Sequence, residues 1–142
     1  MEVHSCKVKA TSSSDNSGGF YSISTFTVYG GSVDAEYTGS GYGYGILLVS
    51  SGSMNIYGGD VKAVGKGTGS CYGITGSSST VTVYGGKLWA EGASKAAIDP
   101  DVTLTKDAGY TSGKIETCDD GTSWTEHTSA GATSTKYVRV GY

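Results

Sequence analysis

The sequence predicts an all-β fold, a right-handed parallel β-helix (β-solenoid) of about four coils, and three observations predict it. A Tyr-Gly-Gly motif recurs with spacings of 28 and 27 residues. Alternating apolar residues flank each copy, and no apolar period near 3.6 residues indicates helix. A fixed period of this length is typical of solenoids, in which each repeat forms one coil. The copies are Tyr29-Gly30-Gly31, Tyr57-Gly58-Gly59 and Tyr84-Gly85-Gly86.

Each element of the coil has its own justification. Val81 and Val83 alternate with polar residues before the glycine pair, and this period of two indicates a strand. Leu88 and Ala90 alternate in the same way after it. The glycine pair interrupts the alternation, which suits a corner that needs the dihedral freedom of glycine. A third short strand follows a Gly/Ser-rich loop, so we expect three strands per coil of about 27 residues, with a two-sided coil as the alternative.

Stacking of the coils aligns the apolar positions in inward columns. A single coil has two unpaired edges, so neighbours about 4.7–4.8 Å away complete its hydrogen bonds and its core. The predicted columns are Val3/Val28/Ile56/Val83, Val8/Val33/Val61/Leu88, Ala10/Ala35/Ala63/Ala90 and Ile23/Ile46/Ile74/Ile98. A tyrosine column, Tyr21/Tyr44/Tyr72, has the parity of the isoleucines. We therefore expect it to serve packing rather than binding.

The repeats predict a solenoid domain over residues 1–105, with coils near 1–25, 26–52, 53–79 and 80–105. Met1 falls in the middle of a coil, which indicates a fragment of a longer protein. No fourth Tyr-Gly-Gly follows Pro100. Two short runs flank Cys118–Thr122, where Asp-Gly is typical of a hairpin turn. Residues 106–142 are therefore predicted to form a C-terminal cap or small β appendage.

Composition excludes several function classes. The net charge is −3 and the 10 lysines and arginines are scattered, so no basic surface for nucleic acid is expected. No apolar run approaches membrane-spanning length, so no membrane insertion is expected in this segment. No Cys/His spacing is typical of zinc, and the Gly-rich segments lack the Lys-Ser/Thr ending of a phosphate loop.

The motif Tyr57-Gly58-Gly59-Asp60-Val61-Lys62-Ala63, followed by Tyr72-Gly73-Ile74, resembles repeats of secreted or surface-anchored bacterial β-helix proteins. Some of those are labelled carbohydrate-binding domain proteins, and the coil length is similar to that of the pectate-lyase-like superfamily. The resemblance covers about residues 1–105. It implies an extracellular or cell-surface location and a polysaccharide or surface glycan as partner. The superfamily includes lyases, hydrolases, adhesins and stalks, so it does not decide the activity.

Acidic residues are the candidates for a metal site. Lyases of that superfamily bind calcium through acidic residues and use a basic residue as base, but here the single arginine, Arg139, lies in the tail. Asp34 shares an outward column with Lys9 and Lys62, which a surface ladder of alternating charge explains. No nucleophile–base pair is evident, so no enzyme is expected, with a polysaccharide lyase-like fragment as the alternative. The candidate calcium ligands are Asp34, Glu36 and Asp60.

Outward aromatic residues are the candidates for ligand binding. Tyr29, Tyr57 and Tyr84 each follow an inward residue, so we expect them to point outward and stack as a ladder. Trp89 lies outward beyond the corner from Tyr84. Exposed rings in a row could stack against the apolar faces of sugars. The alternative is a ladder that only stabilises the coils, by roughly 0.2–1 kcal/mol per pair. We therefore expect a rigid adhesion or spacer module, with a purely structural stalk as the alternative.

Overall fold

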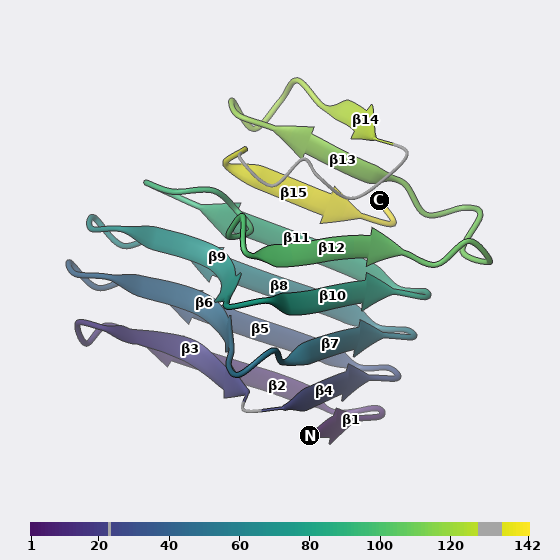
Figure 1. The fold of residues 1–142 in the computed structure, drawn as a ribbon, viewed down its shortest axis with the longest axis horizontal. Coiled ribbons are helices and arrows are strands. Elements are labelled where there is room, and N and C mark those ends of the chain that lie inside the picture. The colour runs from purple at the N-terminus through teal and green to yellow at the C-terminus, as the bar shows by residue number, and fades with distance from the viewer. Residues whose placement is uncertain (23, 128–134) are drawn as a thin grey trace.

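The computed structural model describes residues 1–22, 24–127 and 135–142, and it shows a β-solenoid of about 4 turns (Figure 1). The described residues contain no helix, and their strands pair in parallel from coil to coil. The predicted all-β solenoid is therefore confirmed. None of the described residues belongs to a helix that could cross a membrane.

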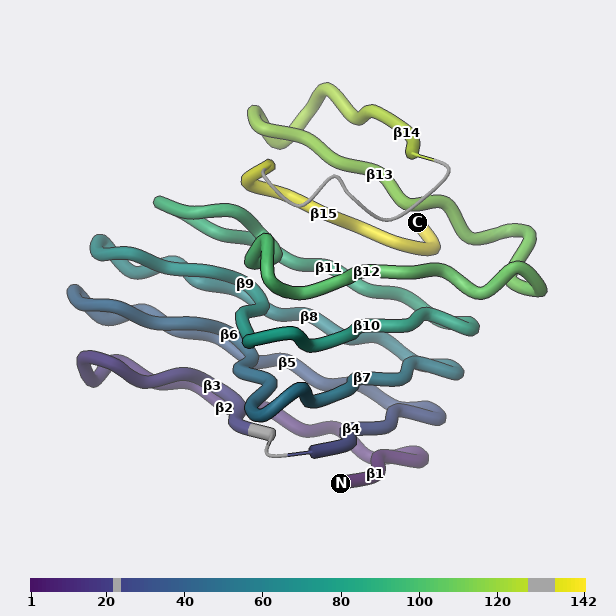
Figure 2. Tube along the Cα trace, viewed as in Figure 1, coloured from purple at the N-terminus to yellow at the C-terminus, as the bar shows by residue number. Residues whose placement is uncertain are grey.

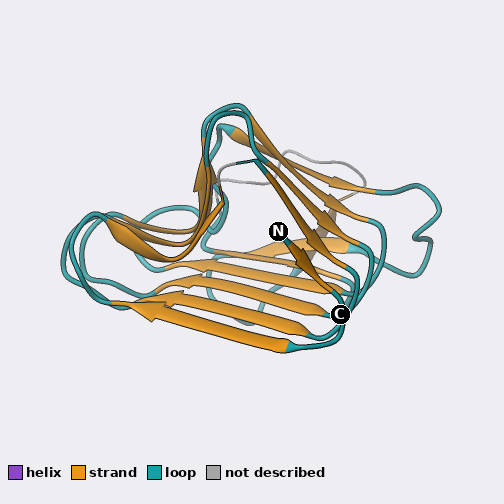
Figure 3. Cartoon of the chain, turned by 90° about the horizontal axis from the view of Figure 1, so that it is seen from below, coloured by secondary structure: helices purple, strands orange, loops and turns teal. Residues whose placement is uncertain are grey.

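Successive coils contribute strands to three sheets, which confirms the three-sided coil (Figure 3). Sheet A contains β1 (Glu2–Val3), β4 (Thr25–Val28), β7 (Ser53–Ile56), β10 (Ser79–Val83) and β12 (Val102–Lys106). The parallel part of sheet B contains β2 (Lys7–Ser12), β5 (Ser32–Tyr37), β8 (Asp60–Gly65) and β11 (Lys87–Gly92). Sheet C contains β3 (Ser17–Ser22), β6 (Gly43–Leu48) and β9 (Cys71–Gly76).

Three predicted inward columns are in register through all their coils. They are the Val3 column of sheet A and the Val8 and Ala10 columns of sheet B. From the second coil onward their side chains are buried and form the hydrophobic core. Burial of one valine, leucine or isoleucine side chain stabilises a fold by roughly 1.5–3 kcal/mol. Repetition of this burial at each level holds the stack together.

The fourth predicted column is correct in three coils and wrong in the first. Ile46 pairs with Ile74, and Ile74 forms a bridge with Ile98. The residue beside Ile46 in the preceding coil is Phe20, while Ile23 lies outside the described residues. Identity of side chain misleads in the first coil, whereas Phe20, Ile46 and Ile74 share a glycine directly before them.

Those preceding glycines form a column that brings sheet C against sheet B. A Cβ at Gly73 would lie 2.7 Å from the backbone nitrogen of Glu91, and a Cβ at Gly19 would lie 2.6 Å from that of Glu36. A Cβ at Gly45 would meet the backbone of β8 in the same way. Only glycine fits where two backbones approach this closely. Figure 3 shows the matching bend in the strands of one sheet.

The predicted Tyr21/Tyr44/Tyr72 column is wrong in register at Tyr21 and in direction, although Tyr44 is 7% exposed and packed as expected. Tyr44 pairs with Tyr72, but its neighbour in the preceding coil is Gly18, and Tyr21 pairs with Leu47. Because the glycine after Tyr44 faces sheet B, the alternation of a strand turns Tyr44 outward. The bend at Gly45 lets Ile46 face inward too, although it follows directly after this glycine. The inward direction of the isoleucine therefore does not predict the direction of Tyr44.

The Tyr-Gly-Gly corners join sheet A to sheet B. Their second glycines, Gly31, Gly59 and Gly86, have φ angles of 79°, 77° and 76°, in the left-handed region that favours glycine. A Cβ at Gly59 would also lie 2.5 Å from the carbonyl oxygen of Gly31 in the coil below. These corners therefore require glycine for two reasons, dihedral angle and space.

Antiparallel strands follow the last coil (Figure 2). β15 (Tyr137–Val140) pairs with β11, β13 (Ile115–Cys118) pairs with β15, and β14 (Thr125–His127) pairs with β13. The hairpin predicted around Asp-Gly is thus confirmed. Its turn is held by Asp120, whose pKa is kept well below the usual range by hydrogen bonds, first from the backbone N–H of Ser123. The cap thereby pairs the edge of sheet B that β11 would otherwise expose.

Candidate functional site

The predicted tyrosine ladder forms at the Tyr-Gly-Gly corners. His4, Tyr29, Tyr57 and Tyr84 stack in that order, with ring centroids 4.7, 5.2 and 4.4 Å apart and interplanar angles of 17°, 12° and 8°. Each tyrosine N–H donates to a carbonyl one coil below, as Tyr57 does to Val28 at 2.8 Å. The tyrosine side chains are 44%, 47% and 37% exposed in chain order. The ladder therefore lies outward, as expected.

Stacking limits which part of each ring faces solvent. Tyr29 and Tyr57 have a neighbouring ring on both faces, so their exposed parts are the ring edges and the phenol ends. Tyr84 has one stacked neighbour, and burial together with Tyr57 raises its pKa. A sugar stacks on a ring face, and the inner rungs offer none.

Trp89 does not contact the ladder: among the described residues, its ring contacts involve other aromatic side chains. Its ring contacts Trp124, Tyr137 and Tyr142 of the cap, with centroids 5.5, 6.2 and 5.9 Å away. Its indole nitrogen is buried, and none of the described residues accepts a hydrogen bond from it. The predicted ligand residue thus lies in an aromatic cluster where the cap covers sheet B.

Arg139 completes that cluster. Its guanidinium lies 3.9 Å from the Trp124 ring centroid and donates two hydrogen bonds to Glu116, at 2.7 and 3.2 Å. These bonds lower the pKa of the Glu116 carboxyl and raise the pKa of Arg139. Packing and an ion pair therefore account for the single arginine of the chain.

The three candidate calcium ligands do not form a common set in the described structure. Asp34 lies in register between Lys9 and Lys62, so charge alternates from coil to coil at this position. Glu36 forms an ion pair with Lys66, with nitrogen and oxygen 3.2 Å apart, and Asp60 is exposed at the start of β8. Among the described residues, no group of three or more His, Cys, Asp and Glu side chains could hold a metal ion.

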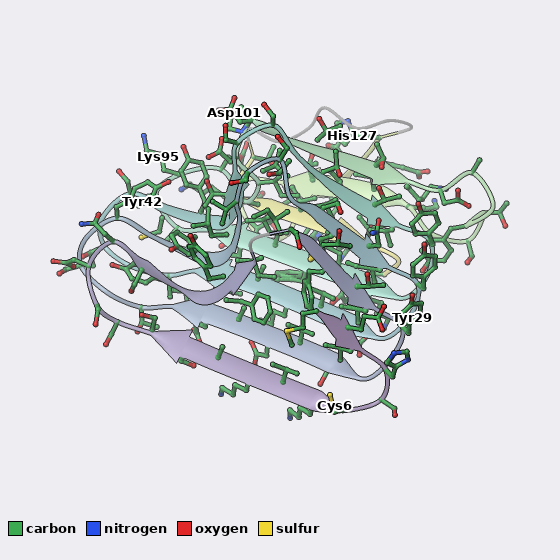
Figure 4. All side chains as sticks on the ribbon, turned by 60° about the horizontal axis from the view of Figure 1, so that its bottom comes forward. Cys6, Tyr29, Tyr42, Lys95, Asp101 and His127 are labelled. Atoms are coloured by element: carbon green, nitrogen blue, oxygen red, sulfur yellow. The ribbon has the colours of Figure 1, made fainter. Side chains whose placement is uncertain are left out.

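Sequence reasoning missed a second tyrosine surface, which we call the tyrosine face: Tyr21, Tyr42, Tyr44 and Tyr72 on the outer side of sheet C and the preceding loop. The Tyr42 ring meets Tyr44 at 6.4 Å and 67°, and Tyr72 at 6.3 Å and 63°. Tyr21 and Tyr42 are 59% and 42% exposed, whereas Tyr44 is 7% exposed. Figure 4 places Tyr42 and the ladder residue Tyr29 at opposite edges of the molecule.

Burial and neighbouring groups perturb the tyrosine face. Burial, followed by Tyr21 and Tyr42, raises the pKa of Tyr44. Burial, followed by Asp99, Tyr42 and Asp101, raises the pKa of Tyr72. The ring contacts of Tyr42 join Tyr44 and Tyr72, and Asp99 and Asp101 influence the Tyr72 phenol of this group. The glycine inside each Tyr-Gly-Ile segment was the available signal, because glycine within a strand indicates close backbone approach.

Comparisons with protein-family models, with curated proteins and with solved structures give no significant match to this chain. The solenoid is therefore established by its strand pairing. The resemblance to pectate-lyase-like and carbohydrate-binding repeats stays a prediction.

Proposed function

We propose that the protein is a non-enzymatic, rigid module of a secreted or cell-surface protein, acting as a spacer or adhesion segment that contacts carbohydrate. The observation that carries the proposal is continuous axial stacking: parallel strand pairing, apolar columns and a ladder of aromatic rings all run from coil to coil. Each coil is fixed by its neighbours, so a short stack resists bending. A rigid stack with outward tyrosines suits presentation or adhesion.

Carbohydrate contact is supported by the chemistry of the exterior. Tyrosine combines an apolar ring with a hydroxyl that donates and accepts hydrogen bonds, which matches the mixed surface of a sugar. Such residues lie outward both in the ladder and on the tyrosine face. The ladder offers phenol edges and hydroxyls, and its last ring, Tyr84, has one stacked neighbour.

The proposal is tested by screening the folded protein against plant, mucin and microbial glycans, with and without calcium. Tyr57→Leu and Asp34→Asn serve as variants of the ladder and the acidic residues. Binding that is independent of calcium and lost in Tyr57→Leu would assign the ladder. Calcium-dependent binding of acidic glycans that is lost in Asp34→Asn would assign Asp34.

The other outcomes bear on the proposal as a whole. Binding that survives both substitutions supports carbohydrate contact at another surface. Failure of the folded wild-type protein to bind any glycan would contradict carbohydrate contact and leave the spacer role alone.

A further inference from the structure

We propose that the tyrosine face is a binding site for a non-acidic glycan, a chain of neutral or amine-bearing pyranose rings. The inference rests on the carbohydrate contact proposed above and assigns it to a surface distinct from the ladder. The observations behind it are ring geometry, hydrogen-bonding groups, rigidity and charge.

Ring geometry separates this surface from the ladder. Tyr42 meets Tyr44 and Tyr72 at interplanar angles of 67° and 63°, whereas the ladder rings are within 17° of parallel. An edge-to-face contact covers at most one face of one of the two rings, so it covers less ring face than parallel stacking does. Tyr21 and Tyr42 are also the more exposed members of the tyrosine face. A pyranose can therefore stack here on a ring face.

Hydrogen-bonding groups lie beside these rings. Asp99 accepts the Thr75 hydroxyl at 2.6 Å and the Asp101 N–H at 3.1 Å, which fixes its carboxylate. Asp101 itself is exposed. Burial raises the pKa of the Tyr72 phenol, and the Asp99 and Asp101 carboxylates add to this shift. Sugar hydroxyls and ammonium groups donate hydrogen bonds, and carboxylates and phenol oxygens accept them.

The strands hold the tyrosine face in place before any ligand arrives. Tyr44 lies over Gly18, where a Cβ would collide with its ring, and Tyr44 and Tyr72 are in register on adjacent strands. The glycine after each of them is held against sheet B. A site whose side chains are already ordered loses less entropy on binding. Tyr42, in the loop before β6, supplies the exposed ring of this arrangement.

Charge defines the class of glycan. Asp99 and Asp101 contribute, after burial, to the raised pKa of the Tyr72 phenol, and the protein carries a net charge of −3. In the described part of the chain, the cation–π contacts involve Trp124 and Tyr142 and none of the four rings of the tyrosine face. An acidic sugar would place its carboxylate near the like charges of Asp99 and Asp101. Neutral and amine-bearing sugars avoid this repulsion.

Calorimetric titration tests the assignment with three probes: a glucosamine oligomer, a neutral cello-oligosaccharide and an oligogalacturonate. We expect the wild-type protein to bind the first or second and to bind the third at least about tenfold more weakly. Tyr42→Leu should weaken binding at least about tenfold, equivalent to about 1.4 kcal/mol. Tyr57→Leu is the matched control, because it removes the same side chain from the ladder. Asp101→Asn is a second, surface variant, which should weaken the amine-bearing probe most.

The outcomes separate this inference from the proposed function. Binding that survives both Tyr42→Leu and Asp101→Asn, or that Tyr57→Leu abolishes, overturns the tyrosine face and leaves carbohydrate contact standing. Preference for the oligogalacturonate also overturns it. If the folded wild-type protein binds neither these probes nor the wider set of glycans, both proposals fail together.

Discussion

The ladder and the tyrosine face are both groups of tyrosines contributed by successive coils, yet they differ in what they leave open to solvent. In the ladder, Tyr57 lies between two nearly parallel rings, so both faces of its ring are covered by neighbouring tyrosines. On the tyrosine face, Tyr42 meets its neighbours at steep angles. We therefore expect the first arrangement to stabilise the stack, and we propose that the second leaves ring surface for a ligand. Exposure alone would not distinguish them, because Tyr57 and Tyr42 are similarly exposed.

The glycines around each tyrosine explain the difference. In the ladder, two glycines follow the tyrosine and form a corner that repeats with nearly the same φ in each coil, so the rings repeat in parallel. In sheet C, one glycine follows Tyr44 and Tyr72 and bends the strand toward sheet B. Gly18 in the coil below has no side chain, so the Tyr44 ring lies over it instead of stacking on another ring.

Loss of the bend in sheet C should lower the free energy of unfolding more than any other change considered below. We expect Gly73→Ala to destabilise the protein by about 3 kcal/mol, because its Cβ would lie 2.6 Å from the carbonyl oxygen of Ala97 and 2.7 Å from the nitrogen of Glu91. Urea unfolding measures the change in free energy. Gly109→Ala is the control, since its Cβ would meet only the carboxylate end of Asp107, at 2.9 Å. Equal losses in the two variants would show that the close approach of the sheets is not a constraint.

Removal of ladder rings should have an intermediate effect that depends on position. Tyr57 has two stacked neighbours and Tyr84 has one, and each aromatic contact contributes about 0.5–1.5 kcal/mol. We therefore expect Tyr57→Leu to lower the free energy of unfolding more than Tyr84→Leu. A double-mutant cycle of Tyr29 and Tyr57 should give a favourable coupling energy in the same range. A coupling energy near zero would mean that the rings stack without stabilising one another.

Alkaline pH should have the smallest effect on the free energy of unfolding, and this effect reports on the buried phenols of the tyrosine face. Folding raises the pKa of Tyr44 and Tyr72 above the ordinary value of 10.0, so it favours their neutral phenols. Their contribution to stability is complete below pH 10.0 and is lost as the pH rises through the raised values. We expect the double variant Tyr44→Phe/Tyr72→Phe to show a shallower loss of stability above pH 10.0 than the wild type. An unchanged pH dependence would contradict the burial of these phenols.

The repeat predicted most of the fold because identical chemistry recurs at identical positions. Glycines with positive φ and inward aliphatic residues leave few ways to stack the coils, so the columns that contain Val28, Val33 and Ala35 were predicted correctly. The error at Phe20 arose where one residue type replaces another in a column. The neighbouring glycine identifies that position better than the identity of its side chain.

The candidate site was less predictable because it depends on angles between rings. Sequence parity placed Tyr29, Tyr57 and Tyr84 outward, but it could not indicate that their faces would cover one another. Trp89 was placed outward as well, yet the cap that covers it is formed by residues distant in sequence. The direction of Tyr44 depends on a bend that period-two alternation does not contain.

NMR of the protein with ¹³C-labelled tyrosine rings would test the central claim most directly, namely that the ladder supports the fold and the tyrosine face binds sugar. The signals of Tyr21, Tyr42, Tyr44 and Tyr72 are followed during titration with the glucosamine oligomer and the cello-oligosaccharide. The account predicts that these signals shift while those of Tyr29, Tyr57 and Tyr84 stay in place. Shifts confined to the ladder tyrosines would contradict it.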